Sequence, residues 1–351
     1  MRLSKTGWGD RVSESLKVNG REVFYYEKGE DRRTDCKVCP RLCNIRPGHR
    51  GFCRVRENRE GVLYATNYGQ CTSYGVDPIE KKPLYHFHPG SFILSLGTVG
   101  CNLRCGFCQN WEIAHGDPKT VYLSPDQAVE AALAARSKGT PNVGLAYTYS
   151  EPFMWYEYVY DSSRLARSKG LKNVLVTNGY VNEEPLKEIL PYIDAMNIDV
   201  KGFTDGYYRD TCAGRLEPVI RTVELSAGKC HVEITTLLVP GLNDSPEEIR
   251  ELARWLGGID RDIPLHFSRY FPNYKFDLDP TPPATMLMAR ETAGEYLNYV
   301  YIGNAPELDG GKTLCPQCSS VVIDRRGYRT SAAGLDGDSC RGCGGSINVV
   351  V

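Results

Sequence analysis

The sequence has little net charge and lacks long apolar runs, and each of these features excludes a class of protein. Its 42 Lys and Arg residues nearly balance 43 Asp and Glu residues, and the formal charge is only -1. No global field therefore favours nucleic acid or a membrane surface. No apolar run approaches the ~20 residues of a membrane-spanning helix. The N-terminal sequence MRLSKTGWGDRV has no apolar signal core, so we expect a cytoplasmic protein.

Long repeats and low-complexity tracts are missing as well. Of the 351 residues, 41% are apolar and 24% are charged, values typical of a globular protein with a substantial core. This length suggests two or three domains, or one large barrel with additions.

Cysteine, by contrast, is abundant, with 14 residues. Because a reducing cytoplasm disfavours disulfides, grouped cysteines indicate metal ligands. Most of them fall into three groups, which are Cys36, Cys39, Cys43 and Cys53, then Cys101, Cys105 and Cys108, and finally Cys315, Cys318, Cys340 and Cys343. We expect the others, Cys71, Cys212 and Cys230, to be small buried apolar side chains.

The middle of the chain alternates strand and helix patterns. Segment 91–97 predicts a buried strand, and Ser124, Pro125 and Gln127 predict a capped helix start. Further strands are expected at 143–149, 173–178, 195–201, 231–239 and 263–271, with helices between them. This alternation requires parallel strands with helical crossovers. About six such units favour a partial or complete βα barrel, in which ligands bind at the carboxyl ends of the strands.

The segments that flank this barrel lack the alternation, and each contains one outer cysteine group. We therefore predict an α/β protein with three parts. They are an N-terminal Cys-rich unit (1–88), the barrel (89–308) and a C-terminal zinc-ribbon or rubredoxin-like unit (309–351).

The sequence CNLRCGFC follows the first barrel strand and spaces Cys101, Cys105 and Cys108 as C-x3-C-x2-C. Thiolates are the usual ligands of iron–sulfur clusters, and three of them leave one iron of a [4Fe–4S] cluster open. That iron can bind the amino and carboxylate groups of S-adenosylmethionine (SAM), and one electron then yields methionine and a 5′-deoxyadenosyl radical. Phe107 can pack on the adenine. The alternatives are a zinc knuckle, although zinc loops favour paired CxxC, and a ferredoxin-type cluster with a distant fourth cysteine.

Together with TYSEP (148–152) and NIDVK (197–201), this loop resembles the radical SAM superfamily, in the branch of pyruvate formate-lyase activating enzyme. The strings GHRGFCRVREN, VDPIEKKPLYHFHPG, HFSRYFP and CPQC make the radical SAM member of the AmmeMemoRadiSam group the nearer match. The resemblance implies a βα barrel with a [4Fe–4S] cluster and SAM. It also implies an electron donor such as ferredoxin or flavodoxin, and Memo-like and AMMECR1-like partner proteins.

The resemblance places SAM contacts at the ends of later strands. Ser150 and Glu151 match a motif that binds the methionine ammonium, and a carboxylate suits that charge. Asp199 and Lys201 share one strand face and match a pair that holds the ribose hydroxyls and the SAM carboxylate. The plain alternatives are a helix cap at 150–151 and a strand-end salt bridge at 199–201.

Asn178 and His266 match further contacts to ribose or methionine in such enzymes. Asn178 precedes Gly179, so a simple turn is the alternative. His266 is equally well explained as a core histidine. Tyr85, His86 and His88 could serve in proton transfer or pack the N-terminal unit on the barrel.

The outer cysteine groups differ in pattern. The C-terminal C-x2-C-x21-C-x2-C predicts a zinc ribbon, with a rubredoxin-like iron site as the alternative. The N-terminal C-x2-C-x3-C-x9-C can close round zinc or an auxiliary iron–sulfur cluster. Nine Arg and Lys residues against five acids between residues 30 and 60 leave RNA binding as an alternative.

The sequence thus predicts a radical SAM enzyme that takes hydrogen from a small molecule or a protein. A glycyl-radical activase is the alternative within this class, although the ferredoxin-like insert that such activases commonly carry after the cluster loop is missing. A non-catalytic metal-dependent RNA-binding module is the alternative of another class. The TYSEP and NIDVK segments argue against it, because a pure binder needs no SAM pocket.

Overall fold

The computed structural model describes residues 20–137 and 139–351. Residues 1–19 lie outside the described part. They include MRLSKTGWGDRV, the segment in which no secretory signal was expected.

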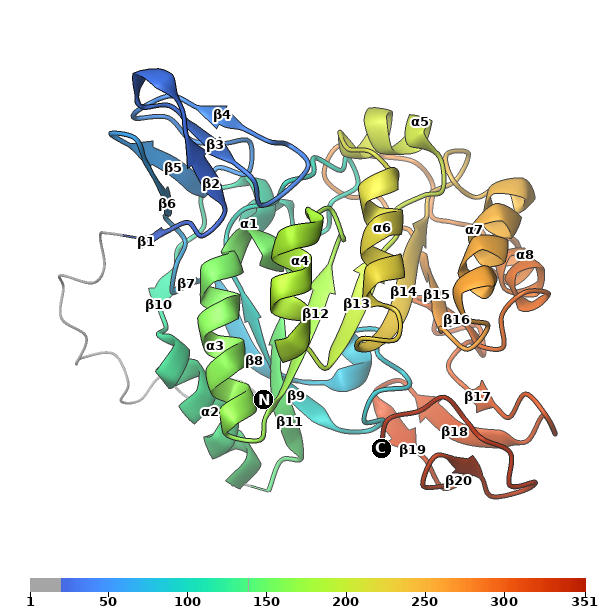
Figure 1. The fold of residues 1–351 in the computed structure, drawn as a ribbon. Helices are drawn as coiled ribbons and strands as arrows, with labels where there is room; N and C mark the ends of the chain where they lie inside the picture. Colours follow the sequence, from blue (N-terminus) through green and yellow to red (C-terminus); the bar gives the residue numbers. More distant parts are fainter. Residues whose placement is uncertain (1–19, 138) are drawn as a thin grey trace.

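An eight-stranded sheet forms the centre of the molecule (Figure 1), in the order β16-β15-β14-β13-β12-β11-β9-β8. Its strands are β8 (Ser73–Pro78), β9 (Phe92–Gly97), β11 (Asn142–Tyr147), β12 (Lys172–Thr177), β13 (Ala195–Asp199), β14 (His231–Leu238), β15 (Leu265–Arg269) and β16 (Val300–Gly303). The strands from β9 to β16 run parallel, whereas β8 is antiparallel to β9. Within the described residues the end strands β8 and β16 do not pair with each other, so the barrel is partial.

Helices connect the parallel strands and cover the outer face of the sheet (Figure 1). They are α2 (Pro125–Ser137), α3 (Tyr156–Ser168), α4 (Glu183–Ile189), α6 (Glu217–Ser226), α7 (Pro246–Ile259) and α8 (Pro283–Gly294). The predicted capping box is present at α2, because the Ser124 N–H donates to Gln127 Oε1 (2.9 Å) and the Gln127 N–H to Ser124 Oγ (3.2 Å). The predicted α/β architecture of a partial βα barrel is confirmed.

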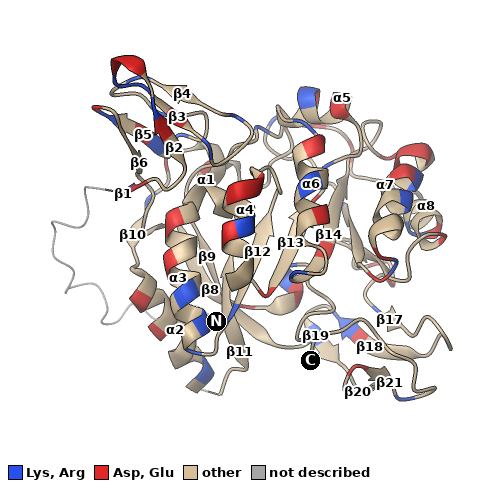
Figure 2. Cartoon of the chain, viewed as in Figure 1, with Lys and Arg blue, Asp and Glu red and all other residues tan. Residues whose placement is uncertain are grey.

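Two short helices lie near the carboxyl ends of the strands. One is α1 (Trp111–His115), which follows the three-cysteine loop, and the other is α5 (Asp205–Tyr207), which leads into a π-helical turn at Tyr208–Cys212. The sequence did not predict either of them. Acidic and basic residues both occur on α4, α6 and α7 (Figure 2), in line with the small net charge. None of the helices in the described ranges combines the length and apolar character that a membrane crossing requires.

The N-terminal unit consists of short strands that pack against α3. Its strands are β1 (Arg21–Glu22), β2 (Tyr26–Lys28), β3 (Thr34–Cys36), β4 (Asn44–Ile45), β5 (Arg56–Arg59), β6 (Val62–Ala65) and β7 (Gln70–Cys71), the last of which pairs with β10 (Val121–Tyr122). A fully buried ion pair joins Arg56 Nη1 to Glu157 Oε2 on α3 at 2.5 Å. Strand β8 precedes residue 88 and yet belongs to the main sheet, so the two parts share a sheet as well as a core.

The C-terminal unit lies below the amino ends of the barrel strands (Figure 1). It contains β17 (Thr313–Leu314), β18 (Val321–Arg326), β19 (Arg329–Ser331), β20 (Leu335–Asp336) and β21 (Ser339–Cys340). Its apolar side chains share a cluster with Tyr299 and Tyr301 of the barrel. Its last residues pair with the segment before β9, where the Val350 N–H donates to His86 O (2.7 Å).

The amino end of the barrel is closed by a buried polar network around Glu233 of β14. This carboxylate accepts the backbone N–H groups of Tyr85 (3.0 Å) and His86 (2.7 Å). The His86 ring bonds Asn348 O and the Tyr301 hydroxyl. Tyr85 and His86 therefore pack the chain before β9 onto the barrel, as one of the two alternatives for them predicted.

Burial lowers the pKa of His86 from its usual 6.5 to about 4, which predicts a pH-dependent stability. The unfolded chain binds this proton below pH 6.5, whereas the folded chain resists it until about pH 4. The stabilisation is complete above pH 6.5 and is lost as the pH falls towards 4, by up to about 3 kcal/mol. Urea unfolding at pH 7 and pH 5 measures the difference.

The His86→Phe variant keeps a ring in place but cannot be protonated. We expect it to be less stable at pH 7 and to lose less stability than the wild type on going to pH 5. His49→Gln, at an exposed histidine, should keep the wild-type pH dependence. A His86→Phe slope equal to that of the wild type would contradict this explanation.

Candidate functional site

The three-cysteine loop lies between β9 and α1, at the carboxyl edge of the sheet. The Asn102 side chain donates to Tyr180 O (2.6 Å) beyond β12. The Arg104 N–H donates to Cys212 O (2.8 Å) and the Gly106 N–H to Thr211 O (3.2 Å) in the π-helical turn. The loop is thus held by two neighbouring strand ends.

The three thiols form a suitable donor set for a cluster. Cys105 is buried, and Cys101 and Cys108 are partly buried. Burial raises the pKa of Cys101 and Cys108, so thiolates here need the charge of a bound metal. Two N–H groups point at Cys101 Sγ, from the Leu103 backbone (3.4 Å) and the Asn178 amide (3.6 Å). Such bonds to sulfur tune iron–sulfur clusters.

Cys212 is a neighbour of this loop that no sequence pattern predicted. A hydrogen bond to Cys212 and burial together raise the pKa of Cys105. Cys212 itself is fully buried, as expected for a small apolar side chain. No local sequence pattern predicts this contact, because Cys105 and Cys212 are far apart in the sequence.

Glu151 and Asn178 lie together beside the loop, each just after a strand. Glu151 accepts the Asn178 N–H (2.9 Å), the Thr177 hydroxyl (2.7 Å) and the Phe153 N–H (3.0 Å). The last bond caps the 3-10 turn Pro152–Trp155, so the cap alternative holds as well. Burial raises the pKa of Glu151 to about 7, although its hydrogen bonds oppose this.

Ser150 presents a buried hydroxyl with no hydrogen-bond partner within the described structure. The preceding residue, Tyr149, has a φ of 70°, which is uncommon for a bulky side chain and turns the backbone sharply at the strand end. An unpaired buried hydroxyl is costly, so this position suits a bound polar ligand.

Asp199 and Lys201 occupy the end of β13, as predicted. Lys201 Nζ lies 2.7 Å from Asp199 Oδ2, and both side chains are largely buried. The salt-bridge alternative is therefore what the structure shows without ligand. Cys105 contributes to the electrostatic environment of Lys201, which places the pair on the same edge as the cysteine loop.

Phe107 is buried in an aromatic cluster. Its ring centroid lies 6.4 Å from that of Tyr207 and 6.0 Å from that of Phe276. A side chain at Gly106 would collide with Phe276, so glycine is required there. Packing of Phe107 on an adenine stays a prediction.

The structure does not bring His266 to this edge. Its Nε2 lies 2.6 Å from Glu233 Oε2, and its ring contacts Tyr85 and Tyr301 at centroid distances of 4.7 and 5.1 Å. In the described residues its contacts thus belong to the network that closes the amino end. The core-histidine alternative describes His266 best.

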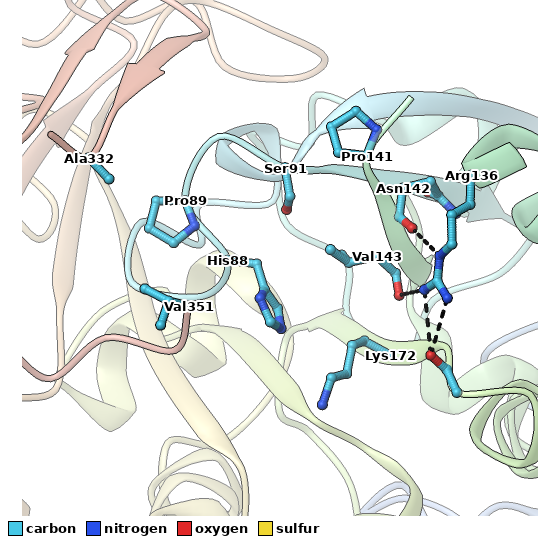
Figure 3. A pocket seen from close by; sticks show the side chains of 11 residues that line it. His88, Pro89, Ser91, Arg136, Pro141, Asn142, Val143, Lys172, Ala332 and Val351 are labelled. Atoms are coloured by element: carbon cyan, nitrogen blue, oxygen red, sulfur yellow. Dashed lines mark hydrogen bonds between the residues drawn. The ribbon is translucent and has the colours of Figure 1, made fainter. Parts of the chain in front are cut away.

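A surface hollow lies at the amino end of the sheet. Figure 3 shows its lining, with His88 and Ser91 before β9, Arg136 at the end of α2, and Lys172 at the start of β12. It measures about 520 Å³. Dashed lines in Figure 3 mark the bonds of the Arg136 guanidinium to backbone carbonyls. This hollow is separate from the cysteine loop, which leaves the opposite end of β9.

The C-terminal cysteines form a compact metal site. All four Sγ atoms lie within 4.8 Å of one another. Cys315 and Cys343 are 3.6 Å apart, and Cys318 and Cys340 are 3.7 Å apart. Four sulfurs around one tetrahedral ion at about 2.3 Å stand about 3.8 Å apart, so this group fits a single zinc or iron.

The N-terminal cysteines, Cys36, Cys39, Cys43 and Cys53, line one small cavity. Most of the surrounding cations have partners in the chain, namely Arg32 with Glu60, Arg33 with Asn44, Lys37 with Glu27, Arg50 and Arg59 with Glu57, and Arg56 with Glu157. The pairs with Glu60, Glu27, Glu57 and Glu157 reduce the free positive charge on which the RNA-binding alternative depends.

Comparison with known proteins matches residues 95–256 to the radical SAM superfamily. An uncharacterized protein of Methanocaldococcus jannaschii is 44% identical over 340 residues, which cover 94% of this chain and 100% of that protein. The pyruvate formate-lyase-activating enzyme of Clostridium pasteurianum is 30% identical over 171 residues, covering 46% of this chain and 67% of that enzyme. The solved structure of a radical SAM methyltransferase from Sphaerobacter thermophilus is similar with a TM-score of 0.48 and 16% identity, covering 62% of this chain and 67% of that chain.

The compact C-terminal site predicts one metal ion that stabilises the last unit. The double variant Cys318→Ala/Cys343→Ala removes two exposed ligands and should lose about one zinc or iron per chain. Hydrogen exchange should rise in β17 to β21 and stay unchanged in β11 to β13. Cys230→Ala, outside the three groups, is the control. A double variant with the same metal content as the wild type would contradict the prediction that these cysteines bind the metal.

Proposed function

The chain belongs to the radical SAM superfamily, and from this we propose that it is an enzyme that cleaves SAM at a [4Fe–4S] cluster held by Cys101, Cys105 and Cys108. When bound, the cluster supplies one electron to SAM, which splits into methionine and a 5′-deoxyadenosyl radical that takes a hydrogen atom from the substrate. We propose a small molecule or a protein as that substrate. A low-potential protein such as ferredoxin or flavodoxin serves as electron donor.

One observation carries the proposal: the three thiols share an edge with a set of polar groups suited to an amino acid. Glu151 offers a carboxylate for the methionine ammonium. Lys201 offers a cation for the carboxylate, once it exchanges its bond to Asp199. Asp199 then accepts the ribose hydroxyls, and Asn178 braces Cys101 through its amide.

The remaining residues of the edge bind and orient rather than react. The free hydroxyl of Ser150 gives SAM one further hydrogen bond. Phe107 offers an apolar face for the adenine. Burial of the edge excludes water, which protects a radical from side reactions.

A glycyl-radical activase is the second candidate, favoured by the 30% identity to the Clostridium pasteurianum enzyme. The metal units at both ends, in place of a ferredoxin-like insert, argue for a different partner. The narrower resemblance to the AmmeMemoRadiSam group, with Memo-like and AMMECR1-like partners, stays a prediction. A stable glycyl radical on a partner chain, seen by electron paramagnetic resonance, would favour the activase.

The first test is SAM cleavage itself. Protein that has been reconstituted without oxygen and given dithionite and SAM should form 5′-deoxyadenosine, measured by chromatography. Cys105→Ala should form none above background, because the cluster then lacks a ligand. Cys230→Ala, which removes a thiol outside the three groups, should retain the activity. Equal product from wild type and Cys105→Ala would rule out the proposed function.

The second test uses the free hydroxyl of Ser150. Ser150→Ala breaks no hydrogen bond of the described structure and removes an unpaired buried hydroxyl, so the free energy of unfolding should not fall. SAM affinity should fall about tenfold, or about 1.4 kcal/mol, in equilibrium binding to the reconstituted protein. Ser91→Ala is the matched control, since its hydroxyl is equally unpaired but lies at the opposite end of β9. Equal affinities of the two variants would remove Ser150 from the SAM site.

A further inference from the structure

The cavity of the N-terminal unit is lined by four cysteines from two loops of the chain. Cys36, Cys39 and Cys53 are buried, and Cys43 is partly buried. A cavity of about 10 Å³ lies between them and their neighbours. The four thiols thus surround a space instead of touching one another.

The separation of the sulfurs distinguishes this site from the C-terminal one. Among the described residues, the C-terminal group is the only set of three or more metal-binding side chains whose ligand atoms all lie within 4.8 Å of one another. In any three of the N-terminal thiols at least one pair of sulfurs is therefore more than 4.8 Å apart, wider than the ~3.8 Å that one tetrahedral zinc requires. Thiolates around an iron–sulfur cluster stand wider because several irons lie between them.

Unpaired donors surround the same cavity. Arg56 and Arg41 both line it. Arg56 Nε and Nη2 and Arg41 Nη2 are buried without a hydrogen-bond partner in the described structure. The Arg56 side chain is only 1% exposed, and among the described residues it donates through Nη1 to Glu157. Guanidinium groups donate hydrogen bonds but cannot accept them, so these side chains suit an anionic occupant with acceptor atoms. The inorganic sulfides and the thiolates of a cluster supply negative charge and acceptor atoms.

The cavity also borders the three-cysteine loop. Asn102 lines it, and the Cys39 thiol interacts with the Asn102 side chain. Asn102 Oδ1 accepts the Asn178 amide (3.0 Å), which also reaches Cys101 Sγ (3.6 Å). Asn102 and Asn178 therefore connect the lining of this cavity to Cys101, a ligand of the other site.

We propose that Cys36, Cys39, Cys43 and Cys53 hold a second iron–sulfur cluster that relays electrons to the cluster of the three-cysteine loop. A low-potential one-electron donor reduces the second cluster by one electron and is itself oxidised. The second cluster then passes that electron on and returns to its oxidised state, with no proton transferred. Arg41, and the Arg56 nitrogens that Glu157 leaves unpaired, donate hydrogen bonds to its sulfur atoms.

The identity of the site is tested by inorganic sulfide, which no single-metal site contains. The triple variant Cys101→Ala/Cys105→Ala/Cys108→Ala lacks the first cluster. After reconstitution without oxygen it should retain iron, acid-labile sulfide and visible charge-transfer absorbance. Adding Cys36→Ala and Cys39→Ala should abolish all three. A triple variant that binds zinc and contains no acid-labile sulfide would overturn the proposal.

The wild-type chain decides the question where the triple variant does not fold. If the chain holds two clusters, the reduced protein should give two electron paramagnetic resonance signals. Added SAM should shift only one of these signals. The content of acid-labile sulfide should exceed about four atoms per chain, which is the content of one [4Fe–4S] cluster. A single signal with about four sulfides per chain would overturn the second cluster. Neither readout depends on SAM cleavage, so the outcome is separate from that of the proposed function.

The relay is tested by the rate of electron entry. Reduced ferredoxin serves as the donor, and the bleaching of cluster absorbance is followed by stopped flow. In the variant Cys36→Ala/Cys39→Ala, ferredoxin should reduce the cluster of the three-cysteine loop at least about tenfold more slowly than it reduces the same cluster in the wild type. Its 5′-deoxyadenosine yield with dithionite, a small reductant that reaches exposed sites, should persist. An unchanged rate with ferredoxin would overturn the relay.

Discussion

The hydrogen bonds of the buried Asn102 hold the cysteine loop in place between the end of β12 and the N-terminal unit. Its amide N–H bonds Tyr180 O beyond β12, and its Oδ1 accepts from Asn178. Its backbone oxygen accepts Arg41 Nε (2.9 Å) from the N-terminal unit. Loss of these partners would leave buried polar atoms unpaired, at about 1–3 kcal/mol each. The position of Cys101 is thereby tied to β12 and to the N-terminal cavity.

The two ends of the barrel are consequently used in different ways. At the amino end, the carboxylate of Glu233 is bonded from several sides and the C-terminal unit covers the opening. At the carboxyl end, Ser150 retains an unpaired hydroxyl, and Asp199 and Lys201 have only a ligand-exchangeable salt bridge between them. The network around Glu233 stabilises the amino end, whereas the unpaired hydroxyl of Ser150 and the exchangeable salt bridge suit the carboxyl end to a ligand.

The sequence predicted the features that depend on local pattern. The capped start of α2 and the main-sheet strands β9, β11, β12, β13, β14 and β15 lie within a few residues of their predicted positions, because caps and apolar periodicity act over neighbouring residues. The placement of Glu151, Asn178 and Asp199 followed from the shared edge of parallel strands. His266 and Cys212 could not be placed in this way, because their contacts with Glu233 and Cys105 come from distant segments. The spacing of the N-terminal cysteines likewise gives ligand order but not the separation of the sulfur atoms.

The claim that SAM binds the iron left open by Cys101, Cys105 and Cys108 is tested most directly by electron–nuclear double resonance on the reduced cluster. SAM labelled with nitrogen-15 at the amino group and oxygen-17 at the carboxylate is added to wild-type protein. Hyperfine coupling of both labels to the cluster spin is the predicted result. An unchanged cluster spectrum without coupling to either label, at a SAM concentration that saturates binding, would contradict it.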